Sequence, residues 1–221
     1  MKQTLIIGAS GGIGAALTQA ARAKGDKVVT LSRSHDGFDV TDEASVKAHL
    51  SGLGGPFETI IIATGALEID GAQPEKSIKS IRQKAMMDQF ALNAIGPALV
   101  LAHAADLMPK DRRSTMAVLS ARVGSIGDNQ LGGWISYRSA KAAVNQIVHT
   151  ASIELSRSHP HSICVALHPG TVATRFTEKY LGRHPAIAPN EAADHLLSII
   201  DGLTVLDSGG FFDWAGQPVP W

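Results

Sequence analysis

Two side chains that could exchange protons with a substrate lie four residues apart in the segment Tyr137-Arg138-Ser139-Ala140-Lys141. Residues at this spacing share one face of a helix, so the phenol and the ammonium would project together. A nearby ammonium favours the phenolate and would lower the tyrosine pKa from about 10 toward the range of general acid–base catalysis. The same spacing is common in surface pairs, so the surrounding chain must decide whether this one forms a site.

A second chemical feature is the glycine-rich loop Gly8-Ala9-Ser10-Gly11-Gly12-Ile13-Gly14, which follows an apolar run and precedes an alanine-rich stretch. Its glycines permit a sharp turn and close approach of the backbone to a ligand. A helix that begins here would offer free N–H groups to a pyrophosphate. The spacing differs from the commoner G-x-G-x-x-G, but the strand–loop–helix context is that of a dinucleotide site. We therefore predict dinucleotide binding.

The end of the next apolar run distinguishes between the two nicotinamide dinucleotides. A carboxylate at this point would bond the ribose 2′-hydroxyl, whereas the chain reads Leu31-Ser32-Arg33-Ser34. The Arg33 guanidinium suits bidentate contact with a 2′-phosphate, so NADP is predicted over NAD. The alternative is that Arg33 is a solvated surface residue.

The elements that must position these groups alternate along the chain. Compact apolar runs predict strands at residues 4–7, 27–31, 59–63, 115–119 and 162–167. Helical patterns cover residues 12–24, 43–50, 77–108, 136–156 and 190–203, the third with a kink at Gly96-Pro97. This alternation predicts an α/β protein, a three-layer doubly wound Rossmann fold with a mainly parallel sheet. We expect one domain over residues 1–221, with residues 209–214 as an edge strand.

Composition narrows the function classes. Twenty basic and twenty acidic residues give a net charge of zero, which argues against nucleic-acid binding. A lone cysteine, Cys164, suits the reducing cytoplasm. Residues 89–105 are uncharged but short and interrupted by Asn93 and Gly96-Pro97, so no membrane span is predicted. The nine histidines show no metal-ligand spacing, and no metal site is expected.

Together these motifs resemble the classical short-chain dehydrogenase/reductase family. The resemblance is carried by Gly8-x-x-x-Gly12-x-Gly14, Asn93, Tyr137-x-x-x-Lys141 and Pro169-Gly170-Thr171-Val172-Ala173-Thr174, which span essentially the whole chain. The short length and the segments Arg122–Gly127 and Phe211–Gly216 are similar to the C-factor and Sniffer-type carbonyl reductase subgroup.

The resemblance implies a catalytic role for three residues. Tyr137 would protonate the carbonyl oxygen, and Lys141 would hold the nicotinamide ribose and depress the tyrosine pKa. Asn93 would anchor the water that relays protons to Lys141; without the resemblance, it could equally serve a hydrogen bond at the helix kink. The family would thus use a Tyr-Lys-Asn site for hydride and proton transfer.

The resemblance also implies cofactor contacts. Asp39-Val40 matches the pair that meets adenine, and Val172 and Thr174 would touch the nicotinamide carboxamide. The implied cofactor-binding set is Gly8, Ser10, Gly11, Gly12, Ile13, Gly14, Ser32, Arg33, Asp39, Val40, Ala63, Thr64, Gly65, Asn93, Tyr137, Lys141, Pro169, Gly170, Val172 and Thr174. The family's N-N-A-G segment appears here as Ile62-Ala63-Thr64-Gly65, which keeps the glycine and loses both amides.

A second departure concerns the family's catalytic serine, whose position is occupied by Ala121. Ser120 is the adjacent candidate, yet neighbours on an extended chain point to opposite faces, so it could act only if the strand end twists or bulges. Ser125 is another possible donor. Because losing one oxyanion donor costs on the order of a hundredfold or more in turnover, the site is slow, differently arranged or no longer catalytic.

The leading hypothesis is an NADPH-dependent carbonyl reductase acting on a small carbonyl compound or secondary alcohol. The short segment of residues 175–189 matches the family's substrate lid and suggests an open, weakly selective pocket. A homodimer or homotetramer is expected, with a monomer as the alternative. The competing hypotheses are an NADP(H)-binding signalling or scaffold protein with little turnover, which Ala121 favours, and a sugar-nucleotide epimerase, for which the chain is short.

Overall fold

The computed structural model describes residues 1–175, 177–180 and 185–221 and contains a six-stranded parallel sheet. The strands are β1 Gln3–Ile7, β2 Lys27–Leu31, β3 Thr59–Ile62, β4 Ser114–Leu119, β5 Ser162–Leu167 and β6 Phe211–Phe212. Their order in the sheet is β2-β1-β3-β4-β5-β6. The five predicted strands and the edge strand near the C-terminus are therefore confirmed.

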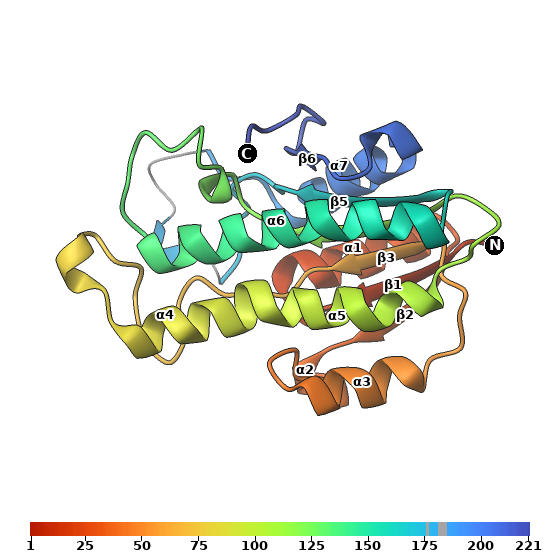
Figure 1. Ribbon diagram of the computed structural model, residues 1–221, viewed down its shortest axis with the longest axis horizontal. Coiled ribbons are helices and arrows are strands. Elements are labelled where there is room, and N and C mark those ends of the chain that lie inside the picture. The colour runs from red at the N-terminus through yellow and green to blue at the C-terminus, as the bar shows by residue number, and fades with distance from the viewer. Residues whose placement is uncertain (176, 181–184) are drawn as a thin grey trace.

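Helices cover both faces of this sheet, which makes the predicted three layers (Figure 1). The helices are α1 Gly12–Ala23, α2 Arg33–Asp36, α3 Glu43–Ser51, α4 Gln83–Phe90, α5 Gly96–Ala104, α6 Ile135–Ser158 and α7 Pro189–Gly202. Short 3₁₀ turns occupy Ile78–Ser80, Ala105–Leu107, Arg122–Gly124, Glu178–Tyr180 and Val205–Asp207. In Figure 1, α4, α5 and α6 lie in front of the sheet and α1 and α7 lie behind it.

The sheet is buried on both faces because successive side chains of its strands enter two different cores. Ile60 and Ile62 pack into the core under α3, α5 and α6, whereas Ile61 packs into the core under α1 and α7. Every residue of β3, β4 and β5 is buried. This is the continuous apolar pattern of strands in a parallel sheet, as the sequence predicted.

The strand order reverses between β1 and β3, so the chain leaves these two neighbours in opposite directions across the sheet. In doubly wound sheets a ligand crevice opens at such a point, outside the carboxyl ends of the strands. Here the loops after β1, β3, β4 and β5 all emerge at that edge, because the strands are parallel. The fold thereby brings the predicted motifs together.

The predicted helix over residues 77–108 is divided. Ser77 caps a 3₁₀ turn, α4 begins only at Gln83, and a π-helical segment, Ala91–Ile95, separates α4 from α5. Pro97 stands in the first turn of α5 and has no N–H to donate to the carbonyl of Asn93, four residues earlier. The break therefore falls just before Gly96-Pro97, close to the predicted kink.

This divided helix is also the one stretch of the described chain whose length and composition would suit a membrane span, over Gln83–Leu107. It packs instead along α6 and α3, and its buried residues include Asn93, Val100, Leu101 and Ala104. A helix in the core of a protein passes the same test of length and composition.

Candidate active site

The glycine loop after β1 places the amino end of α1 at the edge of a cavity. Gly11 is the N-cap of α1 and provides no side chain to cap the first N–H groups, and the first turn contains no acidic residue. A Cβ added to Gly14 would lie 2.2 Å from the carbonyl oxygen of Gly8, so the loop and the helix are in close contact. The N–H groups of this helix end are left for an anionic ligand.

The cavity has a volume of about 580 Å³ and collects residues from the carboxyl ends of four strands. It is lined by Ser10, Gly11, Gly12, Ile13, Gly14, Ala63, Thr64, Gly65, Leu119, Ser120, Ala121, Tyr137, Lys141, His168, Pro169, Gly170, Val172, Ala173, Thr174, Arg175, Thr177 and Pro189. Most of the residues predicted to bind cofactor or substrate are therefore present in one cavity.

Tyr137 and Lys141 enter the cavity from the first turns of α6, and both side chains are buried. The Lys141 Nζ donates to the carbonyl oxygen of Leu119 at 3.0 Å and lies 5.9 Å from the centre of the tyrosine ring. Burial raises the pKa of Tyr137 and lowers the pKa of Lys141 to about 8. Burial thus shifts the pKa of Tyr137 in the direction opposite to the predicted lowering.

The amino end of α6 is fixed by the buried carboxylate of Glu75. Glu75 accepts hydrogen bonds from the backbone N–H and the hydroxyl of Ser136. Trp134 precedes the helix in the left-handed region, with a φ of 52°, and its N–H donates to the Glu75 carbonyl oxygen. The rings of Trp134 and Tyr137 meet edge to face at 6.4 Å, so this corner orients the Tyr137 side chain.

Asn93 lies in the π-helical segment, behind the cavity wall. Its side-chain amide pairs with the backbone of Ala66, accepting at 3.2 Å and donating at 2.9 Å, and also donates to Gln89. A Cβ on Gly65, whose φ is +147°, would lie 2.7 Å from the Asn93 Oδ1 and 3.5 Å from the Lys141 Nζ. Gly65 thus lets the asparagine and the lysine approach one another beneath the cavity.

At the end of β4 the two hydroxyls proposed as substitutes, those of Ser120 and Ser125, are both hydrogen-bonded within the fold. The Ser120 hydroxyl donates to Asn145 Oδ1 at 2.5 Å, and the side chain is buried against α6. Ala121 lines the cavity with a methyl group. Ser125 is buried outside the cavity lining and accepts a hydrogen bond from the N–H of Asp128.

The end of β2 contains an acidic residue that the sequence prediction overlooked. Asp36 folds back so that its carboxylate accepts hydrogen bonds from the backbone N–H and the hydroxyl of Ser32, at 2.7 and 3.1 Å. Arg33 is exposed, and its guanidinium forms no hydrogen bond or ion pair with the described residues. The Arg33 guanidinium and the Asp36 carboxylate therefore both lie at the end of β2, where a dinucleotide-binding protein contacts the ribose 2′-position.

Six of the predicted cofactor residues lie outside the cavity lining: Gly8, Ser32, Arg33, Asp39, Val40 and Asn93. Asp39 accepts hydrogen bonds from the backbone and hydroxyl of Thr41, which lower the pKa of its carboxyl. Val40 is buried, and a Cβ on Gly96 would lie 2.9 Å from its side chain. Their predicted contacts with the adenosine half of a cofactor stay predictions.

The cavity also contains residues that the sequence analysis did not assign, above all His168. It follows β5 directly and precedes Pro169-Gly170, whose glycine packs against the indole of Trp214. Leu119, Ala173, Arg175, Thr177 and Pro189 are the other unassigned lining residues. The lone proline–glycine motif gave no signal that the preceding histidine faces the cavity. Only the pairing of β4 with β5 brings it there.

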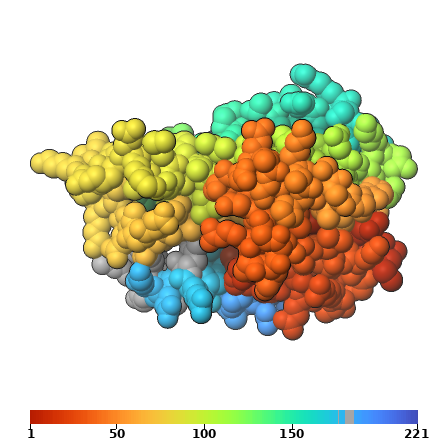
Figure 2. Space-filling view, turned by 90° about the horizontal axis from the view of Figure 1, so that it is seen from below, coloured from red at the N-terminus to blue at the C-terminus, as the bar shows by residue number. Residues whose placement is uncertain are grey.

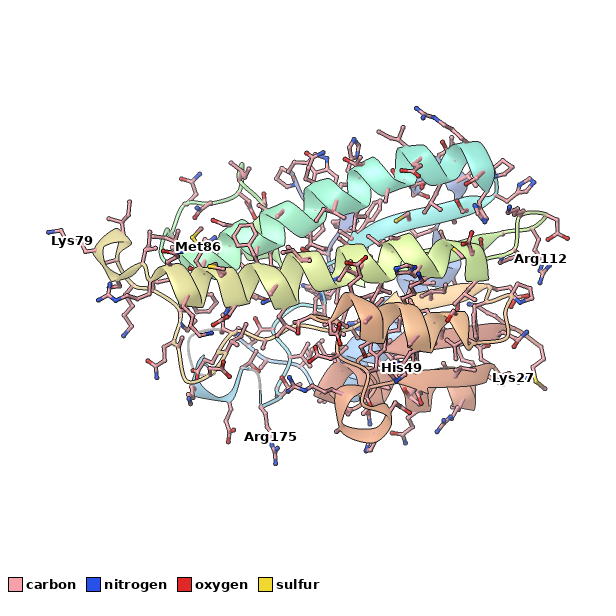
Figure 3. All side chains as sticks on the ribbon, turned by 60° about the horizontal axis from the view of Figure 1, so that its bottom comes forward. Lys27, His49, Lys79, Met86, Arg112 and Arg175 are labelled. Atoms are coloured by element: carbon pink, nitrogen blue, oxygen red, sulfur yellow. The ribbon has the colours of Figure 1, made fainter. Side chains whose placement is uncertain are left out.

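The predicted lid over residues 175–189 is described only in part, since residues 176 and 181–184 lie outside the described chain. Its base is closed by hydrogen bonds of Ile187 with Thr171 and Ala173. Lys179 pairs with Glu68 at 2.6 Å, where the light-blue stretch after β5 lies against the stretch after β3 (Figure 2). Arg175 points away from the body of the molecule (Figure 3).

The side chains that could bind a metal ion were also compared for clustering. Within residues 1–175, 177–180 and 185–221, no three His, Cys, Asp or Glu side chains come together in a way that could hold a metal ion.

The sequence and the fold have counterparts among known proteins. The family model described as short chain dehydrogenase matches residues 36–183. The chain therefore belongs to the short-chain dehydrogenase family of oxidoreductases, as its motifs predicted.

Particular relatives cover most or all of the chain. The 1-hydroxy-2-glutathionyl-2-methyl-3-butene dehydrogenase of Rhodococcus sp. (strain AD45) is 29% identical over 236 residues and covers 100% of both proteins. C-signal of Myxococcus xanthus is 34% identical over 137 residues, which cover 62% of this chain and 78% of that protein. The NADPH-bound carbonyl reductase from chicken fatty liver matches in structure with a TM-score of 0.81 and 24% identity, over 100% of this chain and 99% of that one.

Proposed function

We propose that this protein is an NADPH-dependent carbonyl reductase that converts small aldehydes or ketones to alcohols and, in reverse, oxidises secondary alcohols. The observation that carries this proposal is the shared cavity, in which Tyr137 and Lys141 stand across from the glycine loop. General acid–base groups beside a dinucleotide cradle suit the coupled transfer of a hydride and a proton.

The residues present fit a nicotinamide dinucleotide. The uncapped amino end of α1 would hold its pyrophosphate, and Lys141 would bond the nicotinamide ribose. Gly12 leaves room beside Thr174, since a Cβ there would lie 2.6 Å from the threonine methyl. When bound, the reduced nicotinamide supplies a hydride to the carbonyl carbon of the substrate.

The protein's own groups handle the proton. Since burial raises the pKa of Tyr137, the phenol is protonated at neutral pH and can donate its proton to the substrate oxygen. The hydride and this proton together complete the alcohol. Lys141, with a pKa of about 8, is placed to return a proton to the tyrosine, and Asn93 would anchor the water that supplies it. A protonated tyrosine favours the direction of reduction.

Cofactor preference is proposed from Arg33, whose exposed guanidinium can bind a 2′-phosphate. The chicken carbonyl reductase with the same fold was solved with NADPH, which supports this choice. The carboxylate of Asp36, beside Ser32, opposes it by repelling a phosphate. We propose that the arginine outweighs the aspartate and that NADPH is used in preference to NADH.

The test is NADPH oxidation, followed by absorbance, with a panel of aldehydes, ketones and quinones. Tyr137→Phe removes only the ionisable oxygen and is expected to lower kcat by about 10²–10⁴-fold, the usual contribution of a general acid. The Kd for NADPH, measured by calorimetry, is expected to stay within a few-fold. A mutant that keeps full turnover would exclude the proposed proton donor.

The relative from Rhodococcus suggests one addition to the panel, because it matches this chain from end to end. Its name describes a dehydrogenase of an alcohol that carries a glutathionyl group. We therefore include hydroxyalkyl glutathione conjugates, assayed with NADP in the oxidative direction.

A second candidate function is an NADP(H)-binding signalling or scaffold protein with little turnover. Ala121, in place of a hydroxyl donor, favours it, as does the 34% identity to C-signal. Saturable NADPH binding without turnover of any panel member would support this candidate. It would also make Tyr137→Phe silent in every assay.

For the assembly we propose a homodimer or homotetramer formed through α4 and α6. Exposed apolar side chains on this face of the molecule include Met87, Ile95 and Ile153, each at least half exposed. Light scattering after size exclusion would measure the mass. We propose a cytoplasmic location, in keeping with a single, buried cysteine.

A further inference from the structure

The site has one proposed donor to the substrate oxygen, the Tyr137 hydroxyl, and the residues at the end of β4 add no second one. Ala121 presents only a methyl group to the cavity, and the neighbouring Ser120 directs its hydroxyl to Asn145. A carbonyl that accepts a hydride develops negative charge on its oxygen, and one missing donor there typically costs 10²–10³-fold in turnover. Either turnover is slow or another side chain supplies this donor.

The neighbouring strand places a side chain beside the gap. β4 and β5 pair in register with Leu119 opposite Leu167, and the N–H of Ser120 donates to the carbonyl oxygen of Leu167 at 2.8 Å. In this register the next residues, Ser120 and His168, lie side by side at the ends of the two neighbouring strands, and Ala121 follows Ser120. It lines the same cavity as Ala121 and Tyr137.

The backbone of His168 is fixed by a hydrogen bond, whereas its imidazole ring makes none within the described chain. Its backbone N–H donates to the carbonyl oxygen of Phe212 at 2.8 Å, and Pro169 follows directly. The ring nitrogen Nδ1 is buried without a partner, and the ring forms no hydrogen bond with any described residue. Because Nδ1 is closed off from the cavity, Nε2, which is not among the buried unpartnered atoms, is the ring nitrogen that a ligand can reach.

The surroundings keep this imidazole neutral. Burial and the Arg122 guanidinium lower the pKa of His168 to about 4, against the opposing effect of Asp213. Arg122 is itself paired with Asp128 and Asp213. A neutral imidazole has one N–H donor and does not compete with Tyr137 as a proton source.

We propose that His168 is a catalytic residue that donates a hydrogen bond to the substrate oxygen, in place of the hydroxyl that Ala121 lacks. No bond to His168 forms or breaks: the hydride reaches the carbon, the proton comes from Tyr137, and the imidazole N–H stabilises the developing charge. This inference rests on the proposed reductase function and deepens it.

The test is a double-mutant cycle on the full-length protein, with NADPH oxidation as the readout. His168→Ala is expected to lower kcat about a hundredfold with an unchanged Kd for NADPH by calorimetry. Adding Ala121→Ser to this variant is expected to recover at least about tenfold, because the hydroxyl takes over the donor role. In the wild-type background the gain in kcat from Ala121→Ser is expected to be smaller than in His168→Ala, since His168 already supplies a donor.

Two further variants guard against a structural explanation. His195→Ala is the matched control, because the Nδ1 of His195 is also buried without a partner but lies outside the cavity lining. It is expected to leave kcat unchanged. His168→Gln keeps an N–H donor and is expected to retain more turnover than His168→Ala, which keeps the test valid if the alanine variant folds poorly.

The opposite outcomes overturn the inference. These are full turnover in His168→Ala, equal gains from Ala121→Ser in both backgrounds, no advantage of Gln over Ala, or a loss of NADPH affinity that matches the loss of turnover. A wild-type protein with no turnover overturns the reductase and this role together. A wild type that is active, silenced by Tyr137→Phe and indifferent to His168→Ala overturns this role alone.

Discussion

Arg33 and Asp36 bring opposite charges to the end of β2 within a single helical turn. Arg33 opens α2 with a free guanidinium, and Asp36 closes it with a carboxylate that bonds back to Ser32. The sequence revealed the arginine because it lies two residues after the last residue of β2. It concealed the aspartate, because only the 3–4 residue periodicity of a one-turn helix returns Asp36 to the strand end.

These two charges predict opposite changes in cofactor preference. Arg33→Ala is expected to weaken NADPH binding by about 10–100-fold and NADH binding little, as expected for loss of one charge-assisted hydrogen bond of 1.5–3 kcal/mol. Asp36→Asn is expected to strengthen NADPH binding relative to NADH. Calorimetric Kd values for both cofactors check this, with Arg157→Ala on the exposed end of α6 as the control. Equal losses for NADPH and NADH in Arg33→Ala would remove the arginine from the phosphate site.

The pairing of Tyr137 and Lys141 could be predicted from the sequence, but the direction of their pKa shifts could not. Spacing alone placed Tyr137 and Lys141 on one helix face. The direction of their pKa shifts depends on burial by the cavity walls and on the bond from Lys141 to the Leu119 carbonyl, neither of which a linear pattern contains. His168 was missed for a related reason, since it reaches the cavity through strand pairing.

At the scale of elements, the contact between α1 and the loop before it sets the shape of the predicted nucleotide-binding loop. The loop bends back so far that the Gly8 carbonyl oxygen fills the space where a side chain of α1 would begin. The N–H groups at the amino end of the helix are aligned by this contact. A change there must affect both folding and ligand binding.

Gly14→Ala is therefore expected to destabilise the protein by about 1–3 kcal/mol, the usual cost of overpacking. That corresponds to a fall in Tm of roughly 3–10 °C for a domain of this size. The added methyl would lie 2.2 Å from a backbone oxygen that cannot rotate away. Gly54→Ala is the control, because nothing lies within 4 Å of a Cβ there. Calorimetric scans compare the two, and equal Tm values would contradict the steric contact.

Strand positions were predictable because β3, β4 and β5 are apolar throughout, and burial on both faces demands that pattern. The long helix was less predictable. Apolar residues continue across residues 83–107, and the π-helical segment at Ala91–Ile95 leaves no mark in that pattern. Pro97 alone indicated a break, and it marks where the break ends.

At the scale of the whole molecule, groups whose pKa is lowered by folding make the free energy of unfolding depend on pH. The pKa of His168 is lowered to about 4 in the folded chain, from an ordinary value of 6.5. Between these values the unfolded chain binds the extra proton and the folded chain does not. Stability is consequently lost as the pH falls from about 6.5 to about 4. The carboxyls of Asp39, Glu58 and Asp201, whose pKa values are lowered, act in the same direction at lower pH.

His168→Gln is expected to remove the first part of this acid sensitivity. The free energy of unfolding of the wild type is expected to fall by about 2 kcal/mol more than that of the variant between pH 7.5 and pH 5. Urea titrations at the two pH values measure the difference. Identical losses in both proteins would mean that His168 takes up a proton in the folded state as easily as in the unfolded one.

The strand order of the sheet determines which of the predicted motifs lie close together. Strand–helix alternation predicted the doubly wound class, and the order β2-β1-β3-β4-β5-β6 determines which loops share an edge. No local pattern states that order, because it depends on the packing of whole helices on two faces of the sheet. Once it is known, Gly65, Ala121, Tyr137 and His168 become neighbours despite the length of chain that separates them.

Two of the three tryptophans of the chain lie beside the cavity. Trp134 meets the ring of Tyr137, and Trp214 lies against Gly170. Indoles emit light at wavelengths that reduced nicotinamide absorbs, so an occupied cavity would dim the natural fluorescence of the protein. The intrinsic tryptophan fluorescence would therefore report NADPH binding, so NADPH can be titrated without a dye or label.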